Sequence, residues 1–119
     1  MLKLAKLFNK GASAKPLPRV PEGERFYVIG DIHGRCDLFD ELILAIENDD
    51  RKAGDARSTV VMLGDLIDRG PESARVIETA RQWRDHRAVR YIAGHHEEMF
   101  LESFEDKAML RHFLKHGGR

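Results

Sequence analysis

The sequence has a single cysteine, Cys36, among its 119 residues. One cysteine excludes an intrachain disulfide framework and a cysteine-rich zinc site, and it predicts a cytoplasmic protein. Long hydrophobic runs are also missing, because no apolar segment approaches the roughly 20 residues that a membrane-spanning helix needs. Neither a P-loop nor the glycine pattern of dinucleotide-binding proteins occurs, which weakens functions that depend on cradling a nucleotide.

An excess of charge of either sign is lacking as well. Twenty lysines and arginines balance twenty aspartates and glutamates. The net charge of the chain therefore gives no electrostatic attraction to nucleic acid or to an anionic membrane, and we expect no nucleic-acid partner. Any site that binds an anion must come from a local group of residues. A chain of this length forms one domain at most, with one modest hydrophobic core.

The beginning of the chain differs from the rest in composition. The first 21 residues carry basic side chains and no acidic one, and they become rich in proline, glycine, alanine and serine. We expect residues 1–22 to form a basic leader and linker, and residues 23–119 to form the folded portion. A short amphipathic turn built on Leu2, Leu4, Leu7 and Phe8 is an alternative to a frayed tail, which is the favoured interpretation.

Strand-like and helix-like patterns alternate from Arg25 onward. Short apolar, β-branched segments predict strands at 25–30, 58–64 and 88–94. Apolar residues at helical spacing predict helices at 37–48, at 71–83 with Pro71 in its first turn, and from about 97 to 116, where Gly117 and Gly118 would end it. This alternation predicts an α/β fold of βαβαβα units around a mainly parallel sheet, with the loops that follow the strands gathered at one edge.

The first of these loops is Gly-Asp-Ile-His-Gly, residues 30–34. Asp31 and His33 lie two residues apart, so in an extended chain both side chains point the same way and can chelate one cation. The flanking glycines let the backbone turn tightly and approach a ligand. Taken alone, an ordinary turn between strand and helix is an equally good interpretation.

The second loop, Gly-Asp-Leu-Ile-Asp-Arg-Gly at residues 64–70, adds Asp65 from the neighbouring strand. A second carboxylate suits a ligand that bridges two cations, and carboxylates together with imidazole favour Mn, Fe or Zn over calcium. Arg69 offers a planar fork of donors that matches phosphate. The alternative for Arg69 is a surface ion pair with Asp68 or Glu72.

The third loop begins Gly-His-His-Glu-Glu-Met at residue 94. One of its two histidines could bind metal and the other could give a proton to a leaving oxygen, with Asp68 holding its tautomer. Two solvated histidines at a helix start are the alternative. Metals about 3.5–4 Å apart that activate a water for phosphoester hydrolysis would use all three loops. No covalent nucleophile is then required, and Cys36 is expected to be a packing residue.

The complete first and second loops resemble two signatures of the calcineurin-like metallophosphoesterases of the phosphoprotein phosphatase type, and the third is similar to their Gly-Asn-His-Glu. The resemblance covers residues 26–119. It implies half of an α/β/β/α sandwich and a phosphorylated substrate, either a phosphoserine or phosphothreonine protein or a small phosphoester. It also implies roles for single residues: Asp31, His33 and Asp65 as ligands of the first of two metals, Asp65 as the bridge, His96 as general acid supported by Asp68, and Arg69 as a phosphate ligand.

The third loop departs from the family pattern at His95, where the family has a metal-binding asparagine. A histidine could bind the second metal through a ring nitrogen, with a different reach and bulk. The family also supplies two further histidines from later strands, in domains of roughly twice this length. His112 and His116 are not those ligands by position, and we expect them on the surface of the last helix.

The second metal, expected to be Mn like the first or else Fe or Zn, would therefore keep only Asp65 and His95 as ligands in this chain. A half-built second site predicts impaired hydrolysis. The alternative function is a catalytically silent module that binds a metal, a phosphate or a partner. An uncovered sheet would favour self-association.

Overall fold

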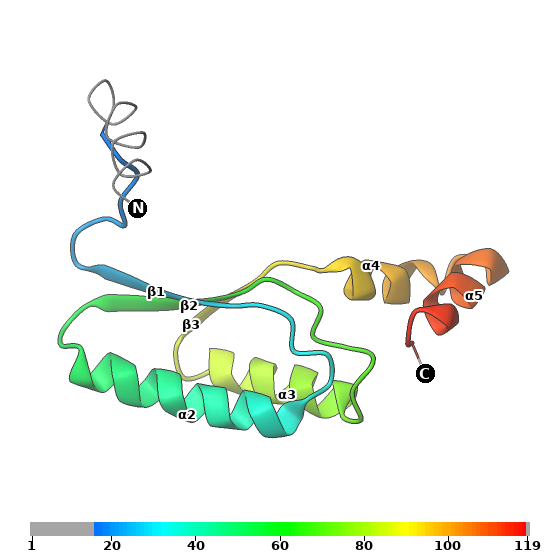
Figure 1. Cartoon of the computed structure of the whole chain (residues 1–119), viewed down its shortest axis with the longest axis horizontal. Coiled ribbons are helices and arrows are strands. Elements are labelled where there is room, and N and C mark those ends of the chain that lie inside the picture. Colours follow the sequence, from blue (N-terminus) through cyan, green and yellow to red (C-terminus); the bar gives the residue numbers. More distant parts are fainter. Residues whose placement is uncertain (1–15, 119) are drawn as a thin grey trace, which may run out of the picture.

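Three strands alternate with helices in the computed structural model, which describes residues 16–118 (Figure 1). The elements are β1 (Glu24–Ile29), α2 (Cys36–Lys52), β2 (Arg57–Met62), α3 (Ser73–Arg84), β3 (Ala88–Tyr91), α4 (His95–Glu102) and α5 (Lys107–Lys115). The amphipathic turn predicted around Leu2 to Phe8 lies outside the described residues. Among residues 16–118, no helix combines the length and apolarity needed to cross a membrane.

The strands form one parallel sheet in the order β1-β2-β3. Val28 of β1 pairs with Val61 of β2, and Val60 of β2 pairs with Val89 of β3. The predicted α/β class and parallel sheet are thereby confirmed. Because every strand runs the same way, the three loops that follow them meet at the carboxyl edge of the sheet, which is where α4 and α5 also lie (Figure 1).

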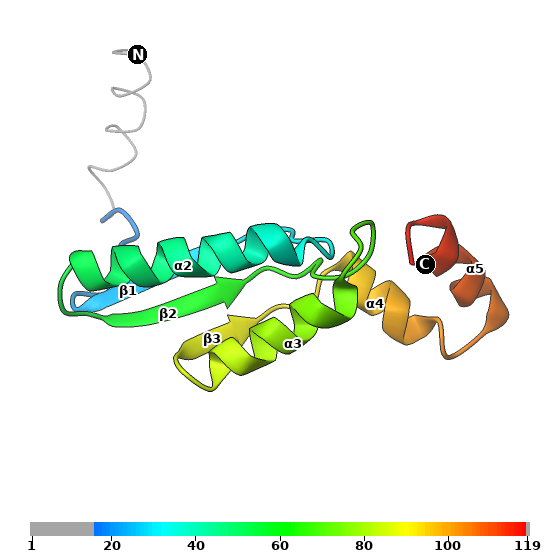
Figure 2. The same cartoon turned by 90° about the horizontal axis from the view of Figure 1, so that it is seen from below.

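Both long helices cover the same face of the sheet (Figures 1 and 2). The buried core lies between that face and the helices, and Phe39 of α2 meets Trp83 of α3 edge-on with ring centroids 6.0 Å apart. Cys36 is fully buried in this core, as expected for a packing residue. Strand side chains therefore alternate between this core and the opposite face.

The opposite face of the sheet carries exposed apolar side chains. Phe26 is 41% exposed and Val28 60%, whereas Ile29, which points to the helices, is 5% exposed. A sheet with helices on one face and apolar side chains on the other matches a partial phosphoesterase fold, half of the expected sandwich. Self-association through this face stays a prediction.

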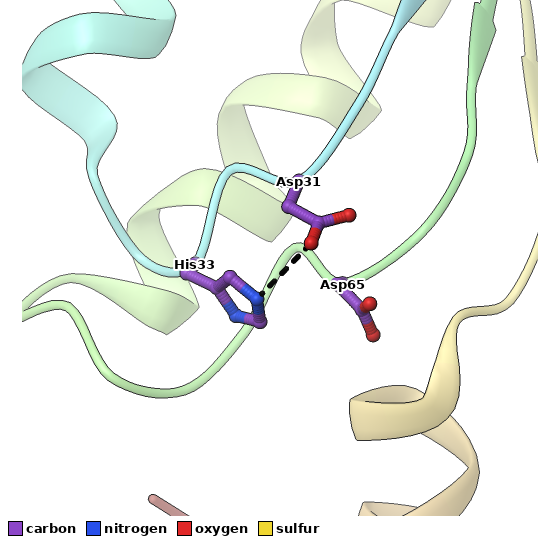
Figure 3. Close-up of side chains that lie close together, drawn as sticks. All are labelled: Asp31, His33 and Asp65. Atoms are coloured by element: carbon purple, nitrogen blue, oxygen red, sulfur yellow. Dashed lines mark ion pairs between the residues drawn. The ribbon is translucent and has the colours of Figure 1, made fainter.

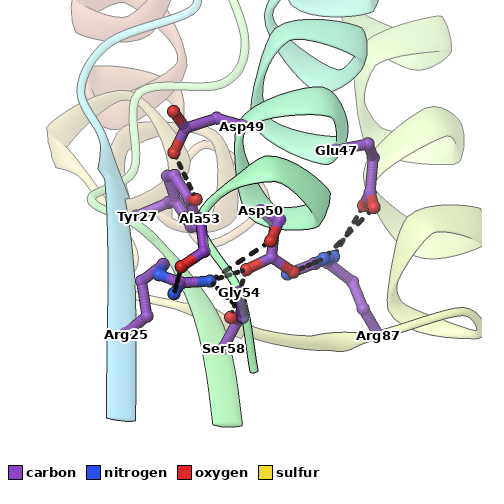
Figure 4. A network of polar contacts seen from close by, with 9 residues as sticks. All are labelled: Arg25, Tyr27, Glu47, Asp49, Asp50, Ala53, Gly54, Ser58 and Arg87. Atoms are coloured by element: carbon purple, nitrogen blue, oxygen red, sulfur yellow. Dashed lines mark hydrogen bonds and ion pairs between the residues drawn. The ribbon is translucent and has the colours of Figure 1, made fainter. Parts of the chain in front are cut away.

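A network of charged residues ties the amino-terminal end of the sheet to α2 (Figure 4). Asp50 accepts hydrogen bonds from the Ser58 hydroxyl (2.5 Å), from Arg25 (2.7 Å) and from Arg87 (2.8 Å). The Ser58 hydroxyl and then the Arg87 guanidinium hold the pKa of Asp50 at about 2. Arg87 also donates to Glu47 at 2.6 Å and 3.1 Å. These contacts fix the end of the sheet that lies away from the three loops.

Two predicted helix boundaries were wrong. Pro71 precedes α3 rather than lying in its first turn: Glu72 is the N-cap residue, whose backbone is not helical, and its N–H is used by the Gly34 carbonyl of the first loop (3.0 Å). The single helix expected from about 97 to 116 is two helices. The Asp106 side chain accepts from the Met109 N–H (2.8 Å), and this cap starts α5 anew.

Candidate metal centre and active site

The first and second loops are joined by their backbones. The N–H groups of Ile32 and His33 donate to the Asp65 carbonyl at 3.1 Å and 2.9 Å. Gly34, at φ +68°, packs so closely on the second loop that an added β-carbon would lie 2.9 Å from the carbonyl of Gly70. This close approach needs glycine and locks the two loops into one unit.

Strained backbone is concentrated in these same loops. Among residues 16–118, the only residues other than glycine with positive φ are His33, Asp65, Asp68 and Arg69, between 46° and 71°. Such conformations persist only when surrounding contacts enforce them, and they gather at functional sites. All four are residues for which the sequence predicted a chemical role.

Three of the predicted metal ligands come together. Asp31 and His33 from the first loop lie beside Asp65 from the second (Figure 3). Each offers a ligand atom, and these atoms lie within 4.8 Å of one another. No other group of three or more such side chains occurs at this spacing in residues 16–118. We call Asp31, His33 and Asp65 the triad.

The orientation of His33 suits a metal ligand. Its Nδ1 lies 2.9 Å from the Ile67 carbonyl, to which it can only donate, so Nε2 is the ring nitrogen that could bind a metal, and it lies 3.5 Å from Asp31. Metal-binding histidines are commonly fixed by a bond of this kind from the other ring nitrogen. Two carboxylates and one imidazole are a donor set for Mn, Fe or Zn, so the residues present fit a divalent cation.

His96 and Asp68 form a buried pair beside the triad. The His96 Nδ1 lies 2.9 Å from an Asp68 carboxylate oxygen, and the two residues are 5% and 6% exposed. The rings of His96 and His33 meet edge-on with centroids 4.7 Å apart. The Asp68 carboxylate accepts a hydrogen bond from the Nδ1–H of His96, which leaves Nε2 of His96 as the atom available for proton transfer.

His95 and Arg69 lie at the same site but outside the triad. Both are exposed and line an open cavity of about 480 Å³ together with all three triad residues and His96. Within residues 16–118 the Arg69 guanidinium forms no ion pair, and Glu72, its suggested partner, binds Arg75 instead. His95 and His96 differ in exposure because α4 begins at His95, so both lie in the first turn of a helix, with His96 turned inward.

Glu97 is a site residue to which the sequence reasoning gave no role. Its carboxylate accepts from the backbone N–H groups of Asp65 (2.5 Å), Leu66 (3.0 Å) and Gly94 (3.0 Å). It thereby ties the second loop to the start of α4. A glutamate three residues after the residue that caps a helix is the available sequence signal.

Comparison with known proteins agrees with this arrangement. Residues 24–118 match the family described as calcineurin-like phosphoesterase. The chain belongs to that family. Its members are phosphoric ester hydrolases that use divalent metals, and the triad gives this chain one candidate site for such a metal.

This chain is similar to several longer curated proteins. It is 32% identical over 93 residues to an asymmetrical bis(5'-nucleosyl)-tetraphosphatase of Oceanobacillus iheyensis, covering 74% of this chain and 37% of that one. A zinc-dependent endopolyphosphatase of Saccharomyces cerevisiae is 32% identical over 95 residues (78% and 27%). A symmetrical bis(5'-nucleosyl)-tetraphosphatase of Hamiltonella defensa is 41% identical over 73 residues (60% and 23%). No solved structure matches the chain.

Proposed function

We propose that this chain carries the metal-binding and proton-transferring half of a hydrolase that cleaves phosphoric esters. The single observation that supports this most is the triad with the buried His96–Asp68 pair directly beside it. A cation site adjacent to an oriented imidazole is what metal-assisted hydrolysis needs. The relatives span much longer chains, so the activity of the whole protein belongs to this proposal.

Asp31, His33 and Asp65 would hold the first cation, for which we propose Mn²⁺. A cation bound there supplies an acidified water and positive charge near the phosphoryl oxygens. Asp65 would also serve a second cation with His95. The Asp65 carboxylate is already oriented, because one of its oxygens accepts from the His96 N–H at 2.9 Å.

His96 would donate the proton to the leaving oxygen from Nε2, because Nδ1 is engaged by Asp68. Asp68 holds this ring in place and stabilises the charged imidazolium. Its 6% exposure excludes water that would compete for the histidine. Arg69, exposed on the cavity, would hold the phosphoryl oxygens with its planar fork of donors.

The substrate would present a phosphoryl group to the open cavity that the triad lines. The sequence suggested a phosphomonoester, including a phosphoserine or phosphothreonine protein, whereas two relatives are named for bis(5'-nucleosyl) tetraphosphates and one for polyphosphate. We therefore include both a phosphomonoester and a bis(5'-nucleosyl) tetraphosphate among the substrates to be tested.

The test is turnover of a chromogenic phosphomonoester and of a bis(5'-nucleosyl) tetraphosphate by the purified chain with Mn²⁺. We expect metal-dependent hydrolysis that Asp65→Asn removes. His86→Gln is the matched control, because His86 is exposed in the turn before β3, at the other end of the sheet. Equal metal-dependent turnover by all three proteins would contradict the proposal.

A catalytically silent module is the second candidate. It is favoured by the apolar sheet face, where Val28 is 60% exposed, because such a face suits a partner. In that case Mn²⁺ binds at the triad, as shown by its loss in Asp65→Asn, while no phosphorylated substrate is turned over. Metal-dependent turnover by the chain alone would exclude the silent module.

A further inference from the structure

We propose that His112 of α5 and His116, the residue that caps the carboxyl end of that helix, form a separate cation site, facing the triad across the same cavity. Both side chains are exposed and both line the cavity of about 480 Å³ that contains Asp31, His33 and Asp65. The ligand is a divalent transition cation that prefers imidazole, and Zn²⁺ is the probe. The proposal does not depend on turnover.

The spacing of the two histidines suits chelation. They are four residues apart, His112 in the last turn of α5 and His116 at its C-cap, so the rings lie next to each other much as in helical zinc motifs with histidines at i and i+4. Their ring centroids are 4.3 Å apart. The Nδ1 of His116 lies 2.8 Å from the His112 carbonyl, to which it donates, so its Nε2 is free to bind metal. His33 of the triad is fixed in the same manner.

The end of α5 is held against the second loop, which fixes where the pair lies. The Arg69 N–H donates to the Gly117 carbonyl at 3.4 Å. Gly117, at φ +101°, ends the helix, and the Gly118 N–H returns to the Phe113 carbonyl at 3.1 Å. α5 also packs on α4 through Phe113 and Phe100, whose ring centroids are 5.7 Å apart. Both contacts keep the histidines turned toward the cavity.

Water would complete this site. Glu102 of α4 lines the same cavity, but no carboxylate of residues 16–118 lies with both imidazoles at the spacing of the triad. Zinc in proteins takes four ligands, so water would fill the positions that the two imidazoles leave open. Two imidazoles favour Zn²⁺, Ni²⁺ or Cu²⁺ over Mg²⁺ or Ca²⁺, so this site would differ in metal preference from one rich in carboxylates.

The experiment measures Zn²⁺ binding by calorimetry on the full chain without a histidine tag. The double variant Asp31→Asn, Asp65→Asn lacks two ligands of the triad, and we expect this variant still to bind one Zn²⁺. Adding His112→Gln and His116→Gln should weaken that binding at least tenfold, whereas adding His86→Gln should leave it unchanged.

A second measurement uses the chain with its triad intact. Zn²⁺ should shift the ring NMR signals of His112 and His116 but not those of His86, and the His112→Gln, His116→Gln double variant should bind one Zn²⁺ fewer than the unaltered chain. Unchanged Zn²⁺ stoichiometry in that variant, or ring signals that do not respond to Zn²⁺, would overturn the second site. Neither result would bear on the triad or on hydrolysis.

Discussion

The two ends of the sheet are built from the same kinds of charged residue and differ in how the charges are paired. At the amino-terminal end, Asp50 and Glu47 meet Arg25 and Arg87 at 2.6–3.1 Å (Figure 4). At the carboxyl end, Asp31 and Asp65 converge with His33. There, no arginine or lysine forms an ion pair with either aspartate within residues 16–118. At the amino-terminal end the carboxylates are neutralised by arginines of the protein itself. At the carboxyl end the carboxylates and His33 offer ligand atoms to a cation from solution.

The difference teaches which carboxylates stabilise the fold and which are available for chemistry. Asp50 is 19% exposed at its side chain and surrounded by donors, whereas Asp31 is 61% exposed at its side chain. Paired carboxylates at a buried end stabilise the fold, and converging exposed carboxylates do not. Substitutions at the two ends should therefore separate stability from function, and the following predictions test that separation.

The largest expected effect is the loss of turnover in His96→Gln. We expect turnover of the chromogenic phosphomonoester to fall about 10²–10⁴-fold, because glutamine can still donate to Asp68 but cannot deliver a proton to the leaving oxygen. The midpoint of urea unfolding should change little. Turnover within threefold of the unaltered chain would remove His96 as general acid.

Arg87→Met should lower the stability of the fold without affecting the metal site, the opposite of what we expect for His96→Gln. Arg87 is 13% exposed at its side chain and pairs with Glu47 and Asp50, so within residues 16–118 its removal leaves Glu47 without a cation and Asp50 with Arg25 alone. We expect a loss of about 3 kcal/mol in the free energy of unfolding, with metal affinity at the triad unchanged. Urea unfolding and Mn²⁺ titration measure the two quantities. Unchanged stability, or weakened metal binding, would break the contrast between the ends.

The sequence predicted the carboxyl end better than the amino-terminal end. The residues of the triad lie within short Gly-Asp loops directly after strands, so position along the chain was enough to bring them together. Arg25 and Asp50, by contrast, are 25 residues apart and carry no local motif. Their contact follows from how α2 packs on the sheet, and no periodic pattern contains that information.

Glu97 and the break before α5 are two further features that the sequence did not predict. Glu97 works through the backbone N–H groups of Asp65 and Leu66, which converge only because Asp65 adopts a positive φ of 52°. The break was hidden because Phe100, Phe104 and Phe113 suggested one continuous helix, although Asp106 offered a cap. The backbone conformation of the turn at Asp65 could therefore not be predicted from the sequence. Nor could the sequence decide whether the cap at Asp106 or the continuing apolar periodicity would determine where the helix ends.

Asp31→Asn tests the stabilisation that the carboxyl end gains from a cation. Mn²⁺ at 100 times its dissociation constant should raise the free energy of unfolding of the unaltered chain by about 2.7 kcal/mol. The variant should lose most of this gain and match the unaltered chain without metal, because Asp31 is exposed and pairs only with His33 among residues 16–118. Urea unfolding with and without Mn²⁺ measures both. An equal Mn²⁺ effect in the variant would place the cation elsewhere.

Asp50→Asn tests the amino-terminal end through acid. The Ser58 hydroxyl and Arg87 hold the pKa of Asp50 at about 2, below the 3.8 of a free aspartate. A depressed pKa means that the carboxylate stabilises the fold above pH 4 and that this contribution fades as the pH falls toward 2. The unaltered chain should therefore exceed Asp50→Asn by about 2 kcal/mol at pH 6, and the gap should narrow at pH 2 to 3. Urea unfolding across this range gives the difference, and a gap that stays constant with pH would mean that Asp50 stabilises the fold through its shape rather than its charge.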